Sequence, residues 1–192
     1  MNQVRIIGGR WRRRLLRFPD ALELRPTPDR VRETLFNWLG QELDGQRVLD
    51  LFAGSGALGV EALSRGAVSV TLVESAAPVV QALRDNASAL GLEGLEVLRS
   101  DALQFAARCR AEGRQFDLLL LDPPYRQGWW DKLVPLLDAL VAKGGQVYVE
   151  AEMAVEPPVG WQVVRAGKAG QVFYQLLERV VASKDEDTHD AG

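Results

Sequence analysis

The sequence predicts an α/β fold, in which a doubly wound, mostly parallel sheet of seven strands carries helices on both faces. From residue 46 onward, short apolar segments alternate with segments of helical spacing. The apolar segments are nearly continuous, which is typical of strands that are buried on both faces of a parallel sheet. The last two apolar segments flank a short turn at 167–170 and predict a hairpin, so one antiparallel strand is expected near the C-terminus.

Each element is indicated by its own pattern. The expected strands are 47–52, 68–73, 95–99, 116–121, 146–150, 161–166 and 171–177. The expected helices between them are 57–65, 78–90, 103–112 and 130–142. In the first of these helices, apolar residues recur on one face and Gly66 provides the stop. The strand 116–121 is the most apolar segment, and two prolines directly after it end the strand.

A further amphipathic helix is predicted before the sheet. Thr27 is the expected N-cap and Pro28 the first helical residue, because proline lacks the N–H that this position leaves unbonded. Apolar residues then recur at helical spacing, at Val31, Leu35, Trp38 and Leu39. We therefore expect three regions: a basic N-terminal arm and helix (1–45), the main α/β domain (46–180) and a disordered acidic tail (181–192).

The composition excludes several classes of protein. A chain of 192 residues with 47% apolar residues can form one domain with a hydrophobic core. No apolar run is long enough to cross a membrane, and the N-terminus lacks the features of a secretory signal, so we expect a cytoplasmic protein that does not bind membranes. Cys109 and His189 are the only residues of their kinds, which argues against a zinc site, another metal centre or a serine–histidine triad. A monomer is expected.

The net charge of -3 conceals an asymmetric distribution. Residues 1–17 contain six arginines and no acid, whereas the tail at 183–192 is acidic. Arginines beside a tryptophan combine phosphate binding with a surface on which a base can stack. The expected RNA-binding residues are Arg10, Trp11, Arg12, Arg13, Arg14, Arg30 and Arg32. The alternatives are a solvated tail for the arm, and ion pairs on the helix surface for Arg30 and Arg32.

Acids and glycines follow the first three expected strands. In open parallel sheets, ligands bind beside the carboxyl ends of the strands, near the point where the strand order reverses. Asp50 precedes a glycine-rich turn, Glu74 ends the second strand, and Asp101 follows the third. A carboxylate in the position of Glu74 can accept hydrogen bonds from ribose hydroxyls. The expected cofactor-binding residues are Asp50, Phe52, Ala53, Gly54, Ser55, Gly56, Glu74, Asp101 and Ala102.

Two cofactors are compatible with the glycine-rich turn. The segment 54–59 matches G-x-G-x-x-G, the fingerprint of dinucleotide binding. Asp50, however, would repel a pyrophosphate and attract a cationic amino-acid group, and Asp101 offers an acceptor for the amine of an adenine. These features favour S-adenosylmethionine, which carries an ammonium and a sulfonium but no phosphate. The alternative for each acid is a simple cap at a strand-to-helix turn.

The segment Asp122-Pro123-Pro124-Tyr125 is the most specific chemical signal in the chain. The two prolines stiffen the backbone and leave carbonyl groups without neighbouring N–H groups of their own. The Asp122 carboxylate and the Pro123 carbonyl can both accept from one exocyclic amine, while Tyr125 can stack on the base. We expect these four residues to be the catalytic residues of an amine methyltransferase that works mainly by positioning. The alternative is a turn with Tyr125 in the core.

Beyond these motifs, the chain resembles a known family over about residues 4 to 178. The segments that carry the resemblance are 8–12, 24–27 (Leu24-Arg25-Pro26-Thr27), 29–39 and 56–59, together with both motifs described above. They are similar to the bacterial 16S ribosomal RNA guanine-966 N2-methyltransferases, which have the Rossmann-like class I methyltransferase fold. Two departures are Tyr125, where phenylalanine is also common, and Arg13, in a run that usually has a glycine between basic residues.

The resemblance implies a substrate and a set of roles. The family methylates the 2-amino group of guanine 966 in a protein-bound intermediate of small-subunit assembly. By resemblance, the Asp-Pro-Pro-Tyr segment holds the target amine, while Glu74 and Asp101 hold the cofactor. The competing hypotheses are a nicotinamide-dependent oxidoreductase, a non-catalytic RNA-binding assembly factor, and an amine methyltransferase that acts on DNA adenine, another RNA or a protein glutamine.

Overall fold

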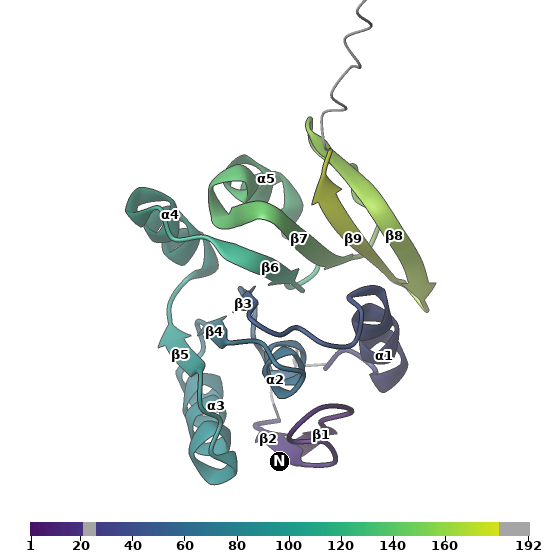
Figure 1. The fold of residues 1–192 in the computed structure, drawn as a ribbon. Coiled ribbons are helices and arrows are strands. Elements are labelled where there is room, and N and C mark those ends of the chain that lie inside the picture. The colour runs from purple at the N-terminus through teal and green to yellow at the C-terminus, as the bar shows by residue number, and fades with distance from the viewer. Residues whose placement is uncertain (21–25, 181–192) are drawn as a thin grey trace, which may run out of the picture.

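The computed structural model describes residues 1–20 and 26–180, and it contains the seven-stranded α/β sheet that the sequence predicts (Figure 1). Its strands are β3 (Arg47–Asp50), β4 (Ser69–Glu74), β5 (Leu95–Arg99), β6 (Phe116–Leu121), β7 (Val141–Ala151), β8 (Trp161–Ala169) and β9 (Val172–Arg179). They lie in the order β5-β4-β3-β6-β7-β9-β8. Neighbours from β5 to β7 are parallel, whereas β9 is antiparallel to both β7 and β8. The prediction of one antiparallel strand near the C-terminus is confirmed.

Helices cover both faces of the sheet, as expected for a doubly wound fold (Figure 1). One face carries α1 (Asp29–Trp38), α2 (Ala57–Ser64) and α3 (Ala77–Leu90), and the other carries α4 (Ala102–Glu112) and α5 (Trp129–Leu140). Successive residues of β6 point to opposite faces, so Leu118 and Leu120 join one apolar cluster while Leu119 and Leu121 join the other. This double burial explains why the strand is apolar at nearly every position.

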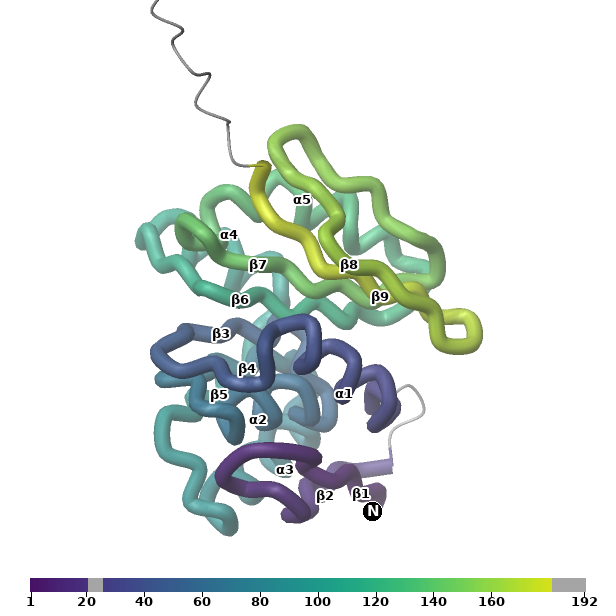
Figure 2. Tube along the Cα trace, turned by 45° about the vertical axis from the view of Figure 1, so that its right-hand side comes forward, coloured from purple at the N-terminus to yellow at the C-terminus, as the bar shows by residue number. Residues whose placement is uncertain are grey.

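The N-terminal segment folds into a β-hairpin, where the sequence predicted only a basic arm. Strands β1 (Asn2–Arg5) and β2 (Leu15–Phe18) pair antiparallel and pack beside α2 and α3 (Figure 2). Four alternating apolar side chains are buried between the hairpin and the helices, namely Val4, Ile6, Leu16 and Phe18. The intervening arginines face solvent. This is the period of two that a half-buried strand requires, and the arginines obscured it in the sequence.

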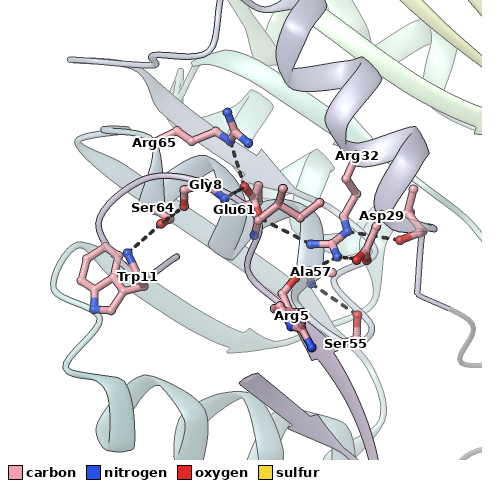
Figure 3. Close-up of polar contacts among 12 residues, drawn as sticks. Arg5, Gly8, Trp11, Asp29, Arg32, Ser55, Ala57, Glu61, Ser64 and Arg65 are labelled. Atoms are coloured by element: carbon pink, nitrogen blue, oxygen red, sulfur yellow. Dashed lines mark hydrogen bonds and ion pairs between the residues drawn. The ribbon is translucent and has the colours of Figure 1, made fainter. Parts of the chain in front are cut away.

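A fully buried carboxylate on α2 holds the hairpin and α1 together. Glu61 accepts hydrogen bonds from the backbone N–H group of Ile7 at 2.8 Å and from that of Gly8 at 2.7 Å. Its oxygens also lie 2.9 Å from Arg65 Nε and 3.4 Å from Arg32 Nη1. Figure 3 shows Glu61 between Gly8, Arg65 and Arg32. Because Arg32 comes from α1 and the glycine from the hairpin, three segments that are distant in sequence meet at this carboxylate.

Ser64, one turn after Glu61, fixes the hairpin loop from the same helix. Its hydroxyl donates to the Gly8 carbonyl at 2.6 Å and accepts from the Trp11 N–H at 2.9 Å (Figure 3). Gly9 has a φ of 73°, and a Cβ atom there would lie 1.8 Å from the Ser64 carbonyl oxygen. Only glycine permits this approach, so the loop docks directly on the C-terminal end of α2.

The start of α1 differs from the sequence-based expectation. Pro28, rather than Thr27, occupies the N-cap position, and no side chain caps the helix. The Thr27 hydroxyl instead donates to the Glu150 carboxylate at 2.8 Å. Tertiary contact with the tip of β7 therefore replaces the local cap. Leu24 and Arg25 of the family motif and the predicted acidic tail (181–192) lie outside the described residues.

We predict that Glu61→Gln destabilises the protein by about 3 kcal/mol, because the change leaves the buried Arg65 guanidinium without a counter-ion and removes one of the two acids that pair with the buried Arg32. Urea unfolding followed by circular dichroism would measure the loss. Glu96→Gln is the matched control, because Glu96 pairs with Arg114 on the exposed surface and such pairs are worth about 1 kcal/mol or less. Equal destabilisation by the two changes would contradict the role of Glu61.

Candidate active site

The glycine-rich turn leads from the tip of β3 into α2 and lies where the strand order reverses. From β3 the sheet grows in one direction through β4 and in the other through β6, so the carboxyl ends of these strands meet at the switch point, where open parallel sheets bind ligands in a crevice. Gly56 takes the N-cap position of α2 with a φ of 78°, a conformation that favours glycine. Gly59 allows α2 to pack closely, since a Cβ atom there would lie 2.3 Å from the Leu72 side chain.

Asp50 is fully buried beneath this turn. Its Oδ2 atom accepts a hydrogen bond from the Gly59 N–H at 3.1 Å, whereas Oδ1 has no hydrogen-bond partner among the described residues. Burial raises the pKa of the Asp50 carboxyl from 3.8 to about 7, and the nearby Glu74 and Glu150 charges act in the same direction. A buried acceptor without a partner suits a cationic or hydrogen-donating ligand and disfavours a phosphate.

The turn also orients Glu74 at the tip of β4. Its two carboxylate oxygens accept from the backbone N–H groups of Gly54, at 3.1 Å, and Ala76, at 2.8 Å. These bonds hold the carboxylate at the tip of β4 beside the glycine-rich turn, and each oxygen keeps a lone pair for a ligand hydroxyl. The structure therefore places Glu74 beside the glycine-rich turn, as the sequence predicted.

Asp101 stands at the third strand tip and is the N-cap of α4, with Oδ1 accepting from the Gln104 N–H at 3.0 Å. This is the capping geometry that the sequence left open as an alternative. The carboxylate is exposed and its second oxygen is not used by the cap, so the cap is compatible with ligand binding. Ala102, the first residue of α4, is buried beside it.

Asp122 follows β6 and lies close to a second carboxyl, Glu150, which the sequence did not single out. The parallel register sets Leu121 beside Val149, so the next residues of the two strands are neighbours. The Thr27 hydroxyl donates to Glu150 Oε1 at 2.8 Å and lies 3.5 Å from Asp122 Oδ2. The same glutamate oxygen accepts from the Tyr148 hydroxyl at 2.9 Å. An acid near the end of an apolar strand, the signal used for Glu74, also marks Glu150.

Burial controls the protonation of this pair. It raises the pKa of Asp122 well above the ordinary range, and the charges of Glu150 and Asp50 raise it further, while the hydrogen bond from Thr27 opposes the shift. Burial likewise raises the pKa of Glu150 against the hydrogen bonds from Thr27 and Tyr148. Paired carboxyls in such an environment resist full ionisation.

The prolines and Tyr125 form the rim of the site. Pro123 is partly buried, Pro124 is exposed, and the Tyr125 side chain is 47% exposed, which excludes the alternative of a core residue. Trp129 fastens the end of this loop, because its indole N–H donates to the Gln127 side chain at 3.1 Å. Its ring also packs edge-on against Phe52, with 4.9 Å between the ring centroids. The glycine-rich turn and the proline loop are thus in contact.

The residues predicted to bind RNA divide into two groups. The side chains of Arg10, Arg12, Arg13, Arg14 and Arg30 are exposed. Trp11 is half-buried, with its indole N–H donating to the Leu90 carbonyl at 3.0 Å and the Arg10 guanidinium stacked 4.8 Å from the ring centroid. The prediction for Arg32 is wrong, because its side chain is only 1% exposed and bonds to Asp29, Glu61 and backbone carbonyls. A helical position alone could not reveal this burial.

The hairpin loop and the crevice occupy opposite ends of α2. The loop packs on Ser64 at the C-terminal end, while Gly56 begins the helix at the crevice. The helix has eight residues and therefore spans about 12 Å. Arg13 has a φ of 71°, in the left-handed region. This conformation favours glycine, the residue that the resemblance leads us to expect in this run.

The strand order and the acids at the strand tips define the class of protein: the fold is the Rossmann-like fold of the class I methyltransferases. The family model described as Conserved hypothetical protein 95 matches residues 4–178, and the chain belongs to this family. Among the described residues, no helix is both long and apolar enough to cross a membrane.

Relatives and solved structures agree with this assignment. Ribosomal RNA small subunit methyltransferase D of Escherichia coli K12 is 43% identical, over 93% of this chain and 91% of the relative. The protein of the same name from Haemophilus influenzae is 37% identical, over 92% and 94%. The solved structure of the Escherichia coli protein yhhF is 42% identical with a TM-score of 0.83, and the match covers 93% of this chain and 98% of that one.

We predict that Asp50→Asn changes how stability depends on pH. A carboxyl whose pKa rises from 3.8 to about 7 on folding binds more protons in the folded state, so its contribution falls as pH rises through that window. Asparagine does not titrate. Between pH 5 and pH 8, the free energy of unfolding of the variant should therefore rise by on the order of 2 kcal/mol relative to that of the native protein. Urea unfolding at both values, with the exposed Asp85→Asn as control, measures this difference. Parallel pH curves would refute it.

Proposed function

We propose that this protein transfers a methyl group from S-adenosylmethionine to the N2 amine of guanine 966 in 16S ribosomal RNA during small-subunit assembly. The carrying observation is the position of Asp122-Pro123-Pro124-Tyr125, which follows β6 at the edge of the acid-lined crevice. The names of the 37–43% identical relatives support small-subunit ribosomal RNA as the substrate.

The acids of the crevice fit the proposed cofactor. Asp50 offers a buried acceptor to the cationic amino-acid part, Glu74 is oriented to accept from the ribose hydroxyls, and Asp101 can accept from the adenine amine. The backbone of the turn completes the site at Phe52, Ala53, Gly54, Ser55 and Gly56, with Ala102 beside Asp101. The same acids disfavour a nicotinamide dinucleotide, whose pyrophosphate would face carboxylates.

The proline loop orients the target amine. Asp122 and the Pro123 carbonyl accept its two hydrogens, so that the nitrogen lone pair faces the methyl group, and Tyr125 stacks on the guanine. When bound, the cofactor supplies the electrophilic methyl group. The chain supplies the orientation and the negative charge that attracts the amine hydrogens, and catalysis consists mainly of these two effects.

RNA binding is assigned to the exposed arginines of the hairpin loop and to Arg30. Their guanidinium groups face solvent and can reach phosphates, while the Arg10–Trp11 pair offers a surface for a base. Arg32 is excluded from this role by its burial. Because the loop lies at the far end of α2 from the crevice, the substrate must extend along this side of the molecule.

We expect Asp122→Ala to reduce methyl transfer at least about 100-fold, in line with the loss of a positioned charged acceptor. S-adenosylhomocysteine should still bind with nearly native affinity, because the change leaves Glu74 and the glycine-rich turn intact. Labelled methyl transfer and calorimetry provide the two measurements. Full activity in the variant would contradict the role assigned to Asp122.

The substrate is tested with labelled S-adenosylmethionine and small subunits from a strain that lacks the methyl group. Nucleoside analysis should find the label in N2-methylguanosine at a single position of 16S RNA. Label in adenine, in another RNA or in protein would overturn the substrate. Calorimetry with NADH tests the competing hypothesis of an oxidoreductase. Tight binding of NADH, without binding of S-adenosylhomocysteine, would favour that class.

The combined change Arg12→Ala, Arg13→Gly and Arg14→Ala should weaken RNA binding and reduce its dependence on salt. The slope of log binding constant against log salt concentration should fall by about 0.7 to 0.9 for each phosphate that is no longer neutralised. The stability of the fold should change little, because glycine adopts the left-handed backbone conformation of Arg13 without strain. Filter binding at several salt concentrations measures affinity. Arg84→Ala with Arg108→Ala and Arg110→Ala is a control of equal charge on α3 and α4. Equal weakening in both variants would remove the loop from the interface.

A further inference from the structure

A buried polar cluster lies directly behind the proposed amine site and is contributed by three separate parts of the chain. Glu150 comes from β7, Asp122 from the end of β6, and Thr27 from the segment before α1. The Glu150 side chain is 3% exposed, Thr27 is 5% exposed, and Tyr148 is fully buried. The two hydrogen bonds to Glu150 Oε1, at 2.8 and 2.9 Å, both come from neutral hydroxyl groups.

Within the described part of the chain, neither Asp122 nor Glu150 forms an ion pair. The titratable groups that face them are Asp50 from β3 and Tyr148 from β7, with Tyr174 of β9 beside Tyr148. The nearest cation on the N-terminal segment is Arg32, whose Nε donates to the Thr27 carbonyl at 3.2 Å and which is neutralised by its own acids. The two carboxyls thus have hydroxyl donors but no counter-ion.

We propose that Glu150 is a positioning residue for methyl transfer: through Thr27 it fixes the Asp122 carboxyl, and the two carboxyls together carry a single negative charge. This inference rests on the proposed function and extends it to residues outside the Asp-Pro-Pro-Tyr segment. The Thr27 hydroxyl is anchored on Glu150 and also lies within 3.5 Å of Asp122. The N-terminal segment thereby becomes part of the catalytic site.

The single charge follows from the surroundings of the pair. Two carboxylates removed from water and close to each other repel, and hydroxyl donors do not compensate two charges. The pair therefore retains one proton to a higher pH than a carboxyl in water would, and the pair titrates as a unit. The pair as a whole supplies the negative charge beside the amine, and an unprotonated oxygen of Asp122 is the acceptor.

The proton balance of the reaction fits this state. The amine lone pair forms the new nitrogen–carbon bond while the methyl–sulfur bond breaks, and its electron pair stays on sulfur as a neutral thioether. The positive charge passes to the nitrogen, which then releases one proton. The carboxyl pair takes up this proton, its charge changes from minus one to zero, and solvent removes the proton when the product leaves.

Glu150→Gln tests the proposal through the pH profile of methyl transfer. The change removes the Glu150 charge, which raises the pKa of Asp122, and it weakens the competitor for the Thr27 hydroxyl, which can then donate to Asp122. The acidic limb of the kcat profile should therefore move to lower pH. The KM for RNA should stay unchanged. Glu178→Gln is the matched control, because Glu178 lies on β9 and accepts from the Gln146 side chain at 2.6 Å, away from the site.

Thr27→Val should shift the same limb in the opposite direction. The Thr27 hydroxyl stabilises the charged forms of both carboxyls, and its removal raises the pKa of each. Activity should therefore require a higher pH than in the native protein. Thr34→Val is the control, since the Thr34 hydroxyl bonds only to the Arg30 carbonyl of its own helix. A structural loss would lower kcat at every pH without opposite shifts.

Proton linkage supplies a readout that is independent of catalysis. Carboxyls with a raised pKa make the folded protein less stable as pH rises through that pKa. Urea unfolding at a series of pH values should show that Glu150→Gln flattens this dependence. Circular dichroism shows whether each variant folds. Unshifted acidic limbs and native proton linkage in folded Glu150→Gln and Thr27→Val would overturn the proposal. Absence of methyl transfer by the native protein would instead overturn the proposed function.

Discussion

The parallel register of the four central strands is the constraint on which the candidate site depends. It brings Asp50, Glu74, Asp122 and Glu150 to one edge of the sheet, although they come from positions that span a hundred residues of sequence. Four acids at one edge repel one another and lose water on folding, so the arrangement costs stability. Backbone amides, hydroxyl groups and retained protons offset that cost, and a cationic ligand would offset more of it.

The N-terminal segment is fixed to this edge through a second buried acid. Glu61 binds the hairpin backbone and Arg32, and the Arg32 Nε atom in turn binds the carbonyl of Thr27. The Thr27 hydroxyl then reaches Glu150. A continuous chain of polar contacts thus runs from the middle of α2 to the proposed amine site. The hairpin and α1 are therefore integral to the packing of the sheet, and their removal would expose one of its apolar faces.

The order of strands and helices and the acids at the strand tips could be predicted from the sequence, because buried parallel strands read as apolar runs and their last residues share one edge. Other features depend on contacts between distant segments. The hairpin was missed because its arginines were interpreted as a basic arm, although Arg5 and Arg17 occupy exposed positions of its alternation. The burial of Arg32 depends on Glu61, 29 residues away. Thr27 does not cap α1 as predicted, because its hydroxyl donates a hydrogen bond to the buried Glu150 carboxylate, which is a stronger partner than the helix terminus.

Under the proposed function, the separation of the hairpin loop from the crevice divides RNA recognition between two surfaces. A rigid proline loop with one carboxylate and one carbonyl acceptor can hold any planar amine, so its geometry alone does not choose a nucleotide. Phosphate contacts fix the register of a nucleic acid without reading its bases. With the two surfaces held about 12 Å apart by α2, a substrate must present the correct amine and a suitably placed backbone together. Selectivity would then arise from the folded shape of the RNA rather than from base-specific contacts, as is usual for structured RNA.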